Sequence, residues 1–282
     1  MRVSIIAPVY NSAAFIEESI QSVLNQTYSN IEYIIMDGGS TDGTVEIAQR
    51  YGDRLTIISE PDNGQSDAIN KGWKRATGDI LAWLNADDLY YPDTVEKAVA
   101  HFQANPQTMW LYGLASFLDE NGEPGHYRYP TFPWDYDKLL TFGNYIVQPT
   151  VFLRREVIEQ FGYLDESLHF GMDYEYWLRI GKTYPADYVP AVRAKVKIFQ
   201  ETKSRSGGYK RMQELETMLK RYGVTELPQV LRHQWVEAML DERDFRRIWR
   251  YPRYVLRGSA KWLLRKTMPK QVEKQLRKWF VK

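Results

Sequence analysis

Short apolar runs alternate with segments of helical periodicity through the first hundred residues, and this alternation limits the possible folds more than any other feature. The apolar runs cover residues 3–9, 31–36, 55–59 and 79–84, and the helical segments cover residues 15–24, 45–51 and 66–76. The first run, VSIIAPV, is almost continuously hydrophobic, which is typical of a strand covered on both faces. The order predicts an α/β fold with a mostly parallel central sheet flanked by helices.

The remainder of the chain divides into a mixed region and a helical end. Residues 105–200 are rich in aromatic residues and turns, and they predict an elaboration of the sheet and not a second copy of it. From residue 209 onward the apolar residues recur at helical spacing. We therefore predict one domain over residues 1–205 and a helical extension over residues 206–282, which is basic and amphipathic from about residue 243.

The composition excludes several classes of protein. With 282 residues, 44% of them hydrophobic, the chain has the composition of a folded globular protein. No apolar run approaches the roughly 20 residues that cross a bilayer, and Glu17 and Glu18 interrupt the N-terminal run before any signal-peptide cleavage site. The absence of cysteine excludes disulfides, thiolate metal sites and a cysteine nucleophile.

Charge is divided unevenly along the chain, although the formal net charge is only +1. Residues 243–282 hold 14 lysines and arginines and two acidic residues, a net charge of +12. The other 23 basic and 34 acidic residues give residues 1–242 a net charge of −11. The sequence therefore combines an acidic body with a strongly basic tail.

Polar and acidic residues follow each of the predicted strands. In doubly wound α/β sheets ligands bind beyond the carboxyl ends of the strands, so these positions are candidates for a binding site. They are Tyr10 and Asn11 after the first strand, Asp37 after the second, residues 60–64 after the third, and Asn85, Asp87 and Asp88 after the fourth, with Asp67 one turn into the third helix.

The adjacent carboxylates of Asp87 and Asp88 are the most specific of these features. Two such groups directly after an apolar strand repel each other unless a cation or a proton shares the site. Hard oxygen ligands favour Mg²⁺ or Mn²⁺, which would bridge to the phosphate oxygens of a substrate. The alternative is that one aspartate caps the next helix while the other faces water.

The turn that begins at Asp37 has two interpretations. Its glycines and short polar side chains are typical of a tight connection from strand to helix. Alternatively, the Asp37 carboxylate accepts a hydrogen bond from a nucleobase or a ribose hydroxyl. The turn lacks the GxGxxG spacing of dinucleotide-binding folds, which disfavours a dehydrogenase.

Taken together, these segments resemble glycosyltransferase family 2, the inverting enzymes with a GT-A fold, of the type acting in bacterial surface polysaccharide biosynthesis. The resemblance rests on PVYN at 8–11, DGGSTDGT at 37–44, SEPDNGQSDAINKG at 59–72 and GDILAWLNADD at 78–88, and more loosely on QPTVFLRR at 148–155 and GMDYEYWLR at 171–179. It covers roughly residues 1–205, which it identifies as a GT-A catalytic domain.

The resemblance implies roles for individual residues. Donor binding would involve Pro8, Tyr10, Asn11, Asp37, Asn63, Asp67 and Asp87. The first three would hold the nucleoside, Asp37 would contact the base, and Asp67 would lie near the ribose and diphosphate. Asp88, supported by Asp87, would bind Mg²⁺ or Mn²⁺, because Asn85 stands where many relatives have an acid.

The resemblance also implies a catalytic base. Asp173 matches the acidic residue that has this role in the family, and Met172 replaces the acid that often precedes it. In a single displacement the acceptor hydroxyl attacks the anomeric carbon as the nucleotide diphosphate departs, so a carboxylate must accept a proton. Alternatively, Asp173 is a surface acid on an amphipathic helix. We expect Trp177 to pack in the core and not to form a sugar platform, and His169 to be a loop residue and not a ligand.

The segment after residue 196 departs from the family pattern. Phe199 stands near the place of a histidine that often assists with the metal or the diphosphate. Lys197, Lys203 or Arg205 would instead neutralise phosphate as fixed positive charges.

The basic tail interleaves aromatic and aliphatic residues with arginine and lysine over residues 245–282. Such amphipathic segments lie in the interface of anionic membranes. The tail therefore predicts a cytoplasmic protein that is peripheral on the inner face of the cell membrane, within reach of a lipid-linked glycan acceptor. The alternative is that the tail packs on the acidic body. Nucleic-acid binding is disfavoured because the chain shows no groove-reading motif.

The predicted function is that of a metal-dependent inverting hexosyltransferase. It would move a sugar from a nucleotide-diphosphate sugar to a hydroxyl of a polyprenyl-diphosphate-linked glycan. Two alternatives come from other classes: a nucleotidyltransferase that forms a sugar nucleotide, and a non-catalytic membrane-bound adaptor with the same fold.

Overall fold

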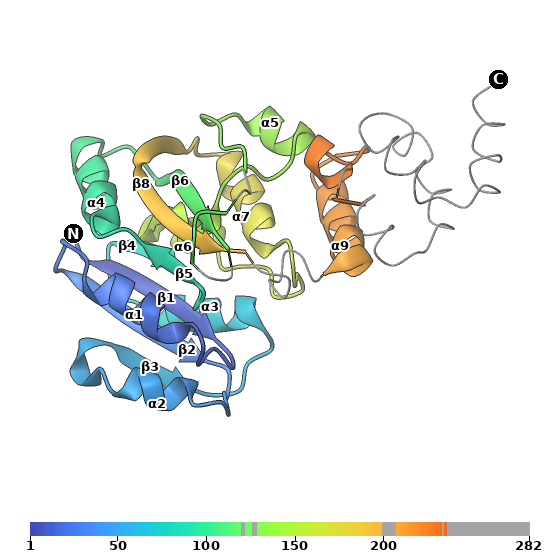
Figure 1. Ribbon diagram of the computed structural model, residues 1–282. Coiled ribbons are helices and arrows are strands. Elements are labelled where there is room, and N and C mark those ends of the chain that lie inside the picture. Colours follow the sequence, from blue (N-terminus) through green and yellow to red (C-terminus); the bar gives the residue numbers. More distant parts are fainter. Residues whose placement is uncertain (120–121, 126–128, 199–206, 233, 236–282) are drawn as a thin grey trace, which may run out of the picture. The chain divides into compact units, whose positions relative to one another are not determined.

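The computed structural model describes residues 1–119, 122–125, 129–198, 207–232 and 234–235 (Figure 1). The chain forms two compact units, one of Met1–Leu139 with Asn144–Gln200 and one of Leu140–Gly143 with Glu201–Lys282. The domain boundary predicted between residues 205 and 206 lies outside the described residues, and so does the basic part of the tail.

The first half of the first unit has the predicted alternation of strands and helices. Its elements are β1 (Val3–Val9), α1 (Ile16–Leu24), β2 (Ile31–Asp37), α2 (Thr44–Gln49), a 3-10 turn (Gly52–Arg54), β3 (Thr56–Ser59), α3 (Gln65–Arg75) and β4 (Ile80–Trp83). All three pairings among the four strands are parallel, in the order β3-β2-β1-β4. The chain adds β2 and β3 on one side of β1 and then returns to add β4 on the other side of β1.

The second half of the unit extends this sheet with mixed pairings. Its elements are β5 (Asp88–Tyr90), α4 (Thr94–Ala104), β6 (Trp110–Leu118), α5 (Tyr136–Thr141, whose last two residues belong to the second unit), a 3-10 turn η2 (Gln148–Thr150), β7 (Phe152–Arg154), α6 (Arg155–Phe161), α7 (Met172–Gly181) and β8 (Asp187–Lys197). The full order is β3-β2-β1-β4-β7-β6-β8-β5. Strand β7 is antiparallel to β4 and β6, β8 is parallel to β6, and β5 is antiparallel to β8. The prediction of a mostly parallel α/β sheet is confirmed.

Strand β5 follows β4 along the chain but lies at the other end of the sheet, where helix α1 covers its open edge. The Ser22 hydroxyl accepts a hydrogen bond from the Tyr90 N–H at 3.2 Å, and the Gln26 side-chain amide donates to the Tyr91 carbonyl at 2.7 Å. Edge strands expose backbone groups that pair with other chains unless they are covered. The side chain of Ser22 in α1 and that of Gln26, which follows α1, satisfy two such groups here, so the sheet curls back toward its own first helix.

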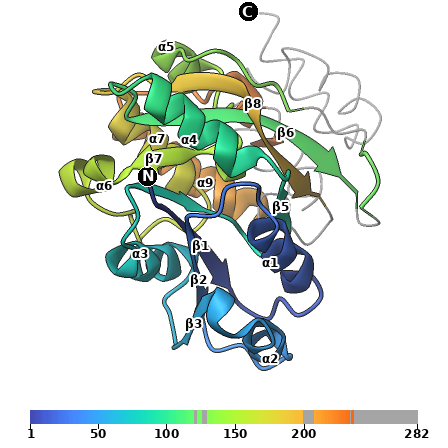
Figure 2. The same cartoon turned by 90° about the vertical axis from the view of Figure 1, so that its left-hand side faces the viewer.

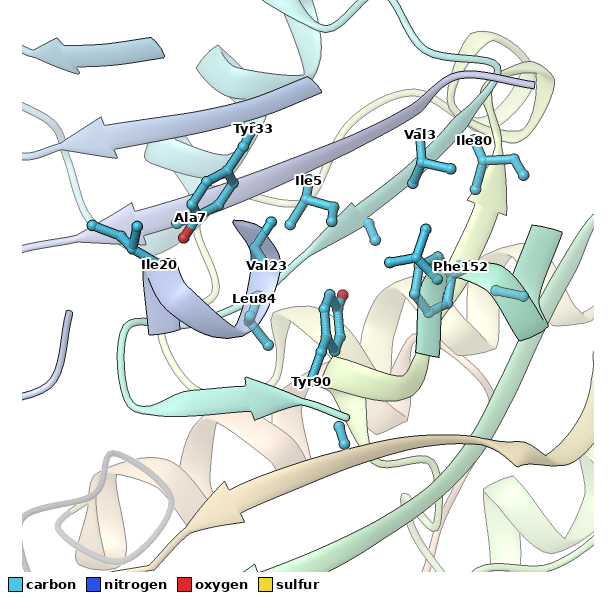
Figure 3. Close-up of a cluster of buried hydrophobic side chains, with 14 of the residues drawn as sticks. Val3, Ile5, Ala7, Ile20, Val23, Tyr33, Ile80, Leu84, Tyr90 and Phe152 are labelled. Atoms are coloured by element: carbon cyan, nitrogen blue, oxygen red, sulfur yellow. The ribbon is translucent and has the colours of Figure 1, made fainter. Parts of the chain in front are cut away.

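Both faces of the parallel strands are buried, which explains their continuous hydrophobicity. One face forms a core in which Ile5 of β1 packs with Ile20 and Val23 of α1 (Figure 3). On the other face α3 approaches β1 so closely that a Cβ at Gly72 would lie 2.4 Å from the Ile6 side chain. Helices α1 and α3 therefore cover opposite faces of the sheet (Figure 2).

The second unit is described mainly through α9 (Gly208–Lys220), which lies where the sequence predicts a helix. Its apolar side buries Met212, Leu215, Met218 and Leu219. No helix within the described ranges combines the length and the apolar character that a bilayer crossing requires.

Candidate active site

The loop after β1 is fastened to the loop after β2. The Asn11 N–H donates to Ser40 Oγ at 2.7 Å, and Asn11 Oδ1 accepts from the Thr41 N–H at 2.9 Å. Asn11 has a φ of 46°, in the left-handed region that asparagine tolerates because of its short polar side chain. Pro8 is buried within β1, whereas Tyr10 is 65% exposed just beyond its end. The loop thus presents an aromatic ring to solvent at the carboxyl end of a central strand.

Asp37 is buried at the end of β2 and closes the turn that follows it. Its carboxylate accepts hydrogen bonds from the Gly39 and Ser40 N–H groups, both at 3.1 Å, and from the Ser59 hydroxyl at 2.6 Å. The structure therefore shows the turn-forming role that the sequence left open. Contact of Asp37 with a nucleobase stays a prediction.

The loop after β3 leads into α3 and holds two further predicted donor-binding residues. Asp67 accepts a hydrogen bond from the Asn63 N–H at 2.9 Å and lies 3.1 Å from Lys71 Nζ. Burial tends to raise the pKa of Asp67, but the Asn63 N–H and Lys71 outweigh burial and lower it. A Cβ at Gly38 would lie 2.5 Å from Asp62 Oδ2, so this loop also borders the turn after β2.

The Asp87-Asp88 pair lies where the chain passes from β4 into β5. Asp88 is the first residue of β5 and is 4% exposed, and Asp87 is half-buried. Neither residue caps a helix, because the N-cap of α4 is Asp93. Burial raises the pKa of Asp87, against the opposing effect of Lys197. Burial and the neighbouring Asp87 charge together raise the pKa of Asp88 well above its usual range.

Asn85 connects this pair to two other segments. Its side-chain amide donates to Asp88 Oδ2 at 3.0 Å and to Gln148 Oε1 at 3.4 Å, and its Oδ1 accepts from Gln65 Nε2 at 2.7 Å. Gln148 in turn donates to the Trp83 carbonyl at 2.8 Å. The sequence indicated Asn85 as a candidate after the fourth strand and as a departure from an acid, but it did not single out Gln65 and Gln148, although both lie within the quoted motifs.

Asp173 lies in the first turn of α7 and is half-buried. Its Oδ2 accepts a hydrogen bond from Asn144 Nδ2 at 3.1 Å, and Asn144 is four residues before Gln148. Met172 is 6% exposed and its sulfur lies 2.8 Å from the Ser66 hydroxyl in the first turn of α3. An acid at position 172 would therefore be buried against α3.

Helix α3 also positions the loop that precedes α7. The Asn70 side chain donates to the Leu164 carbonyl at 3.0 Å and accepts from the Leu164 N–H at 2.9 Å, in the manner of a paired strand. Ser66 donates to the Leu168 carbonyl at 3.3 Å. One helix therefore carries Asp67 and supports the approach to Asp173.

Trp177 and His169 lie where the sequence analysis expected them, in the core and in a loop. Trp177 is fully buried, with its ring stacked 5.5 Å from both Trp83 and Trp110, so it packs in the core and forms no sugar platform. His169 lies in the loop before α7, with its ring edge-on to Phe170 at 4.6 Å.

Lys197, the last residue of β8, lies close to the acidic pair. Its Nζ is 2.5 Å from Glu18 Oε2 of α1, and its side chain is 11% exposed. Burial raises the pKa of Asp87, and the positive charge of Lys197 opposes that rise. Phe199, Lys203 and Arg205, which follow it, lie outside the described residues.

The oxygen donors at this position fit a divalent cation. The described residues contain no cluster of three or more acidic or histidine side chains that could enclose a metal. Mg²⁺ and similar ions are commonly bound through one or two carboxylates, with substrate phosphates and water completing the shell. The pair Asp87 and Asp88 has the required oxygens. Burial raises the pKa of both carboxyl groups, and a cation at this position would favour their charged forms.

Comparison with known proteins identifies relatives of the chain. The model of the family described as glycosyl transferase family 2 matches residues 4–162. An uncharacterized glycosyltransferase of Rickettsia typhi, RT0329, is 31% identical over 214 residues, which are 71% of this chain and 65% of that protein. The chain therefore spans slightly less than two thirds of that relative's length.

Solved structures share the fold. The mannosyltransferase PcManGT from Pyrobaculum calidifontis, in complex with GDP-Man and Mn²⁺, has a TM-score of 0.63 and 21% identity, and the match covers 99% of this chain and 83% of that one. TarS from S. aureus, in complex with UDP-GlcNAc, has a TM-score of 0.62 and 17% identity over 97% of this chain and 83% of the other. These similarities establish a fold of the GT-A type.

Proposed function

Because this chain belongs to glycosyl transferase family 2, we propose that it is an inverting, metal-dependent hexosyltransferase. It would transfer a sugar from a nucleotide-diphosphate sugar to a hydroxyl of a polyprenyl-diphosphate-linked glycan in the synthesis of a surface polysaccharide. The observation that carries the proposal is the arrangement of three carboxylates. Asp87 and Asp88 adjoin Asn85, Asn85 bonds to Gln148, and the same segment holds Asp173 through Asn144.

The acceptor side of the reaction is assigned to Asp173. The acceptor hydroxyl attacks the anomeric carbon, its proton passes to the Asp173 carboxylate, and the bond between that carbon and the diphosphate oxygen breaks. Attack from the face opposite the leaving group inverts the anomeric configuration. The Asn144 amide donates a hydrogen bond to Oδ2 of Asp173 and so orients the carboxylate that would receive the proton.

The donor side is assigned to the carboxyl ends of β1 to β4. Tyr10 and Asn11 would hold the nucleoside, and Asp87 and Asp88 would hold Mg²⁺ or Mn²⁺ against the diphosphate. When bound, the ion supplies positive charge that offsets the charge developing on the leaving group. The complexes of PcManGT with GDP-Man and Mn²⁺ and of TarS with UDP-GlcNAc support a nucleotide sugar as donor and a divalent ion as cofactor.

The purified full chain is expected to release a nucleoside diphosphate from one member of a panel of nucleotide sugars, and to do so only with Mg²⁺ or Mn²⁺. Adding the acceptor should accelerate the release, because its bound hydroxyl is better placed to attack the sugar than water is. The measurement is chromatography of the nucleotide products. Release of inorganic pyrophosphate would indicate a nucleotidyltransferase, and neither release nor a donor-dependent rise in thermal stability would indicate an adaptor.

The second part of the proposal concerns location. The net charge of +12 over residues 243–282, interleaved with aromatic residues, supports peripheral attachment to the inner face of the cell membrane. Each basic residue near an anionic surface contributes about 1 kcal/mol.

Deleting residues 245–282 is expected to release the protein from vesicles that contain phosphatidylglycerol, because the tail supplies the positive charge and the interfacial aromatic residues. Co-sedimentation with vesicles measures this, with uncharged phosphatidylcholine vesicles as the control. Equal sedimentation of the full and shortened chains with the anionic vesicles would rule out attachment through the tail.

A further inference from the structure

Strand β8 carries three cations at alternate positions: Arg193, Lys195 and Lys197, hereafter the basic row. Successive side chains of a strand point to opposite faces, so these three share one face of the sheet. Val192, which precedes the row, and Ala194, which lies within it, are fully buried in the core on the other face. Arg193 is exposed, and Lys195 and Lys197 are half-buried.

Two members of the basic row have no ion-pair partner among the described residues. Lys197 is paired with Glu18 at 2.5 Å. Asp93, which lies near Arg193, is already paired with Lys97 at 2.5 Å. No salt bridge joins Arg193 or Lys195 to any acid that the structure describes. This excess of positive charge is a local exception, since residues 1–242 have a net charge of −11.

Tyr91 holds the two unpaired cations over one ring. The Arg193 guanidinium carbon is 4.6 Å from the ring centroid and Lys195 Nζ is 5.0 Å from it. The Tyr91 hydroxyl is fixed in turn by a 3.0 Å hydrogen bond to Ser116 Oγ of β6. Two cations at one ring repel each other while the ring attracts both, and an anion between them would remove the repulsion. The geometry is that of a preformed anion site.

The basic row extends from the candidate metal position. Asp88 pairs with Val196 at the start of β5, and Tyr91 follows the end of this strand, three residues from Asp88. At about 3.3 Å per residue, Tyr91 is about 10 Å along the strand from Asp88. That distance separates the ring and its two cations from the position assigned to the donor diphosphate. A ligand bound at both places would have to extend over this length.

We propose that Arg193, Lys195 and Tyr91 bind the phosphate groups of the acceptor. This inference rests on the proposed transfer to a phosphate-bearing acceptor, and it adds the place at which the phosphate is held. The guanidinium and ammonium groups supply charge-assisted hydrogen bonds to phosphate oxygens. The acceptor hydroxyl would then lie at Asp173 and Asp88, while its diphosphate is retained about 10 Å along β5.

The test measures binding of farnesyl diphosphate to the full chain by equilibrium dialysis, with EDTA present and no donor, so that the metal position contributes nothing. We expect the double variant Arg193→Ser/Lys195→Ser to bind at least about tenfold more weakly, since two charge-assisted contacts are lost. The matched control is Arg50→Ser/Lys182→Ser, which removes two exposed cations elsewhere in the first unit. It should bind as the wild type does, and farnesol should show no difference among the three proteins.

Several results would overturn the inference. The first is that the wild type does not bind farnesyl diphosphate, and the second is that both double variants bind it equally weakly. The third is that Arg193→Ser/Lys195→Ser binds farnesyl diphosphate normally but sediments less with phosphatidylglycerol vesicles, which would make the basic row a membrane contact. Unchanged binding of farnesyl diphosphate by Arg193→Ser/Lys195→Ser would also contradict the proposal. The cations would then protect β8, whose partner β5 has only three residues, from pairing with other chains. If no sugar transfer is found but Arg193→Ser/Lys195→Ser loses farnesyl diphosphate, the proposed function fails and the site stands. If transfer occurs with an unchanged acceptor KM in that variant, the site fails alone.

Discussion

Replacing Asp88 with alanine is expected to lower donor-dependent transfer by at least about 100-fold, the loss typical of removing a group that positions charge at a leaving group. The carboxylate is buried beside Asp87, and without it the pair has half the oxygens available to a cation. The stability gained on adding Mn²⁺ with a nucleoside diphosphate should fall with the activity. Initial rates and thermal unfolding with and without Mn²⁺ provide the two measurements.

The companion variant Asp88→Asn separates charge from packing. Asparagine keeps the volume of the side chain and a partner for Asn85, so the metal-free protein should be as stable as the wild type or more stable, because a buried negative charge is removed. Activity should still fall by about 100-fold or more. Replacing the exposed Asp53 with asparagine is the control and should change neither quantity. Near-normal transfer by Asp88→Asn would contradict the assignment of this residue to the metal.

Asp173→Asn is expected to reduce kcat by about 100-fold or more while nucleoside diphosphate still stabilises the protein to the same extent. The amide cannot accept the acceptor proton, but it occupies the same place beside Asn144. Initial rates, and thermal unfolding with and without nucleoside diphosphate, provide the two measurements.

Glu175 gives a control on the same helix. It forms an ion pair with Arg179 at 2.8 Å and is 6% exposed. Glu175→Gln should therefore lower the stability, because Arg179 loses its charged partner, and leave kcat as in the wild type. If Glu175→Gln lowers kcat as much as Asp173→Asn does, both losses would come from disruption of α7, and the assignment of Asp173 as the base would be contradicted.

The first half of the fold could be predicted closely because each element is marked locally. The predicted strand at residues 3–9 is β1 without change, and the helix predicted at residues 66–76 is α3, one residue earlier at each end. The position of β5 could not be predicted, because its three residues pair with β8 more than a hundred residues later. Short strands with distant partners carry almost no periodic signal.

In the candidate site, too, residues marked by their local sequence could be predicted and contacts between distant segments could not. The sequence located Asp37, Asp87 and Asp88 by their places after apolar strands. In the structure Asp37 is the last residue of β2, and Asp87 and Asp88 lie between β4 and the start of β5. The glycines and short polar residues after Asp37 indicated a turn, but they could not decide between bonds to that turn and contact with a ligand. The structure shows hydrogen bonds from the Gly39 and Ser40 N–H groups. Asn144 was missed for another reason: its partner Asp173 lies 29 residues away, in a region of mixed patterning.

The stacked indoles of Trp83, Trp177 and Trp110 have a consequence for how substrate range can change. Trp83 ends β4 two residues before Asn85, and Trp177 lies one helical turn after Asp173. Two stacked rings with centroids 5.5 Å apart thus join the strand that leads to Asp87 and Asp88 to the helix that carries Asp173. The spacing of Asp88 and Asp173 is therefore built into the core of the folded protein. Under the proposed function, we expect substitutions that change the preferred acceptor but keep activity to lie away from these three rings.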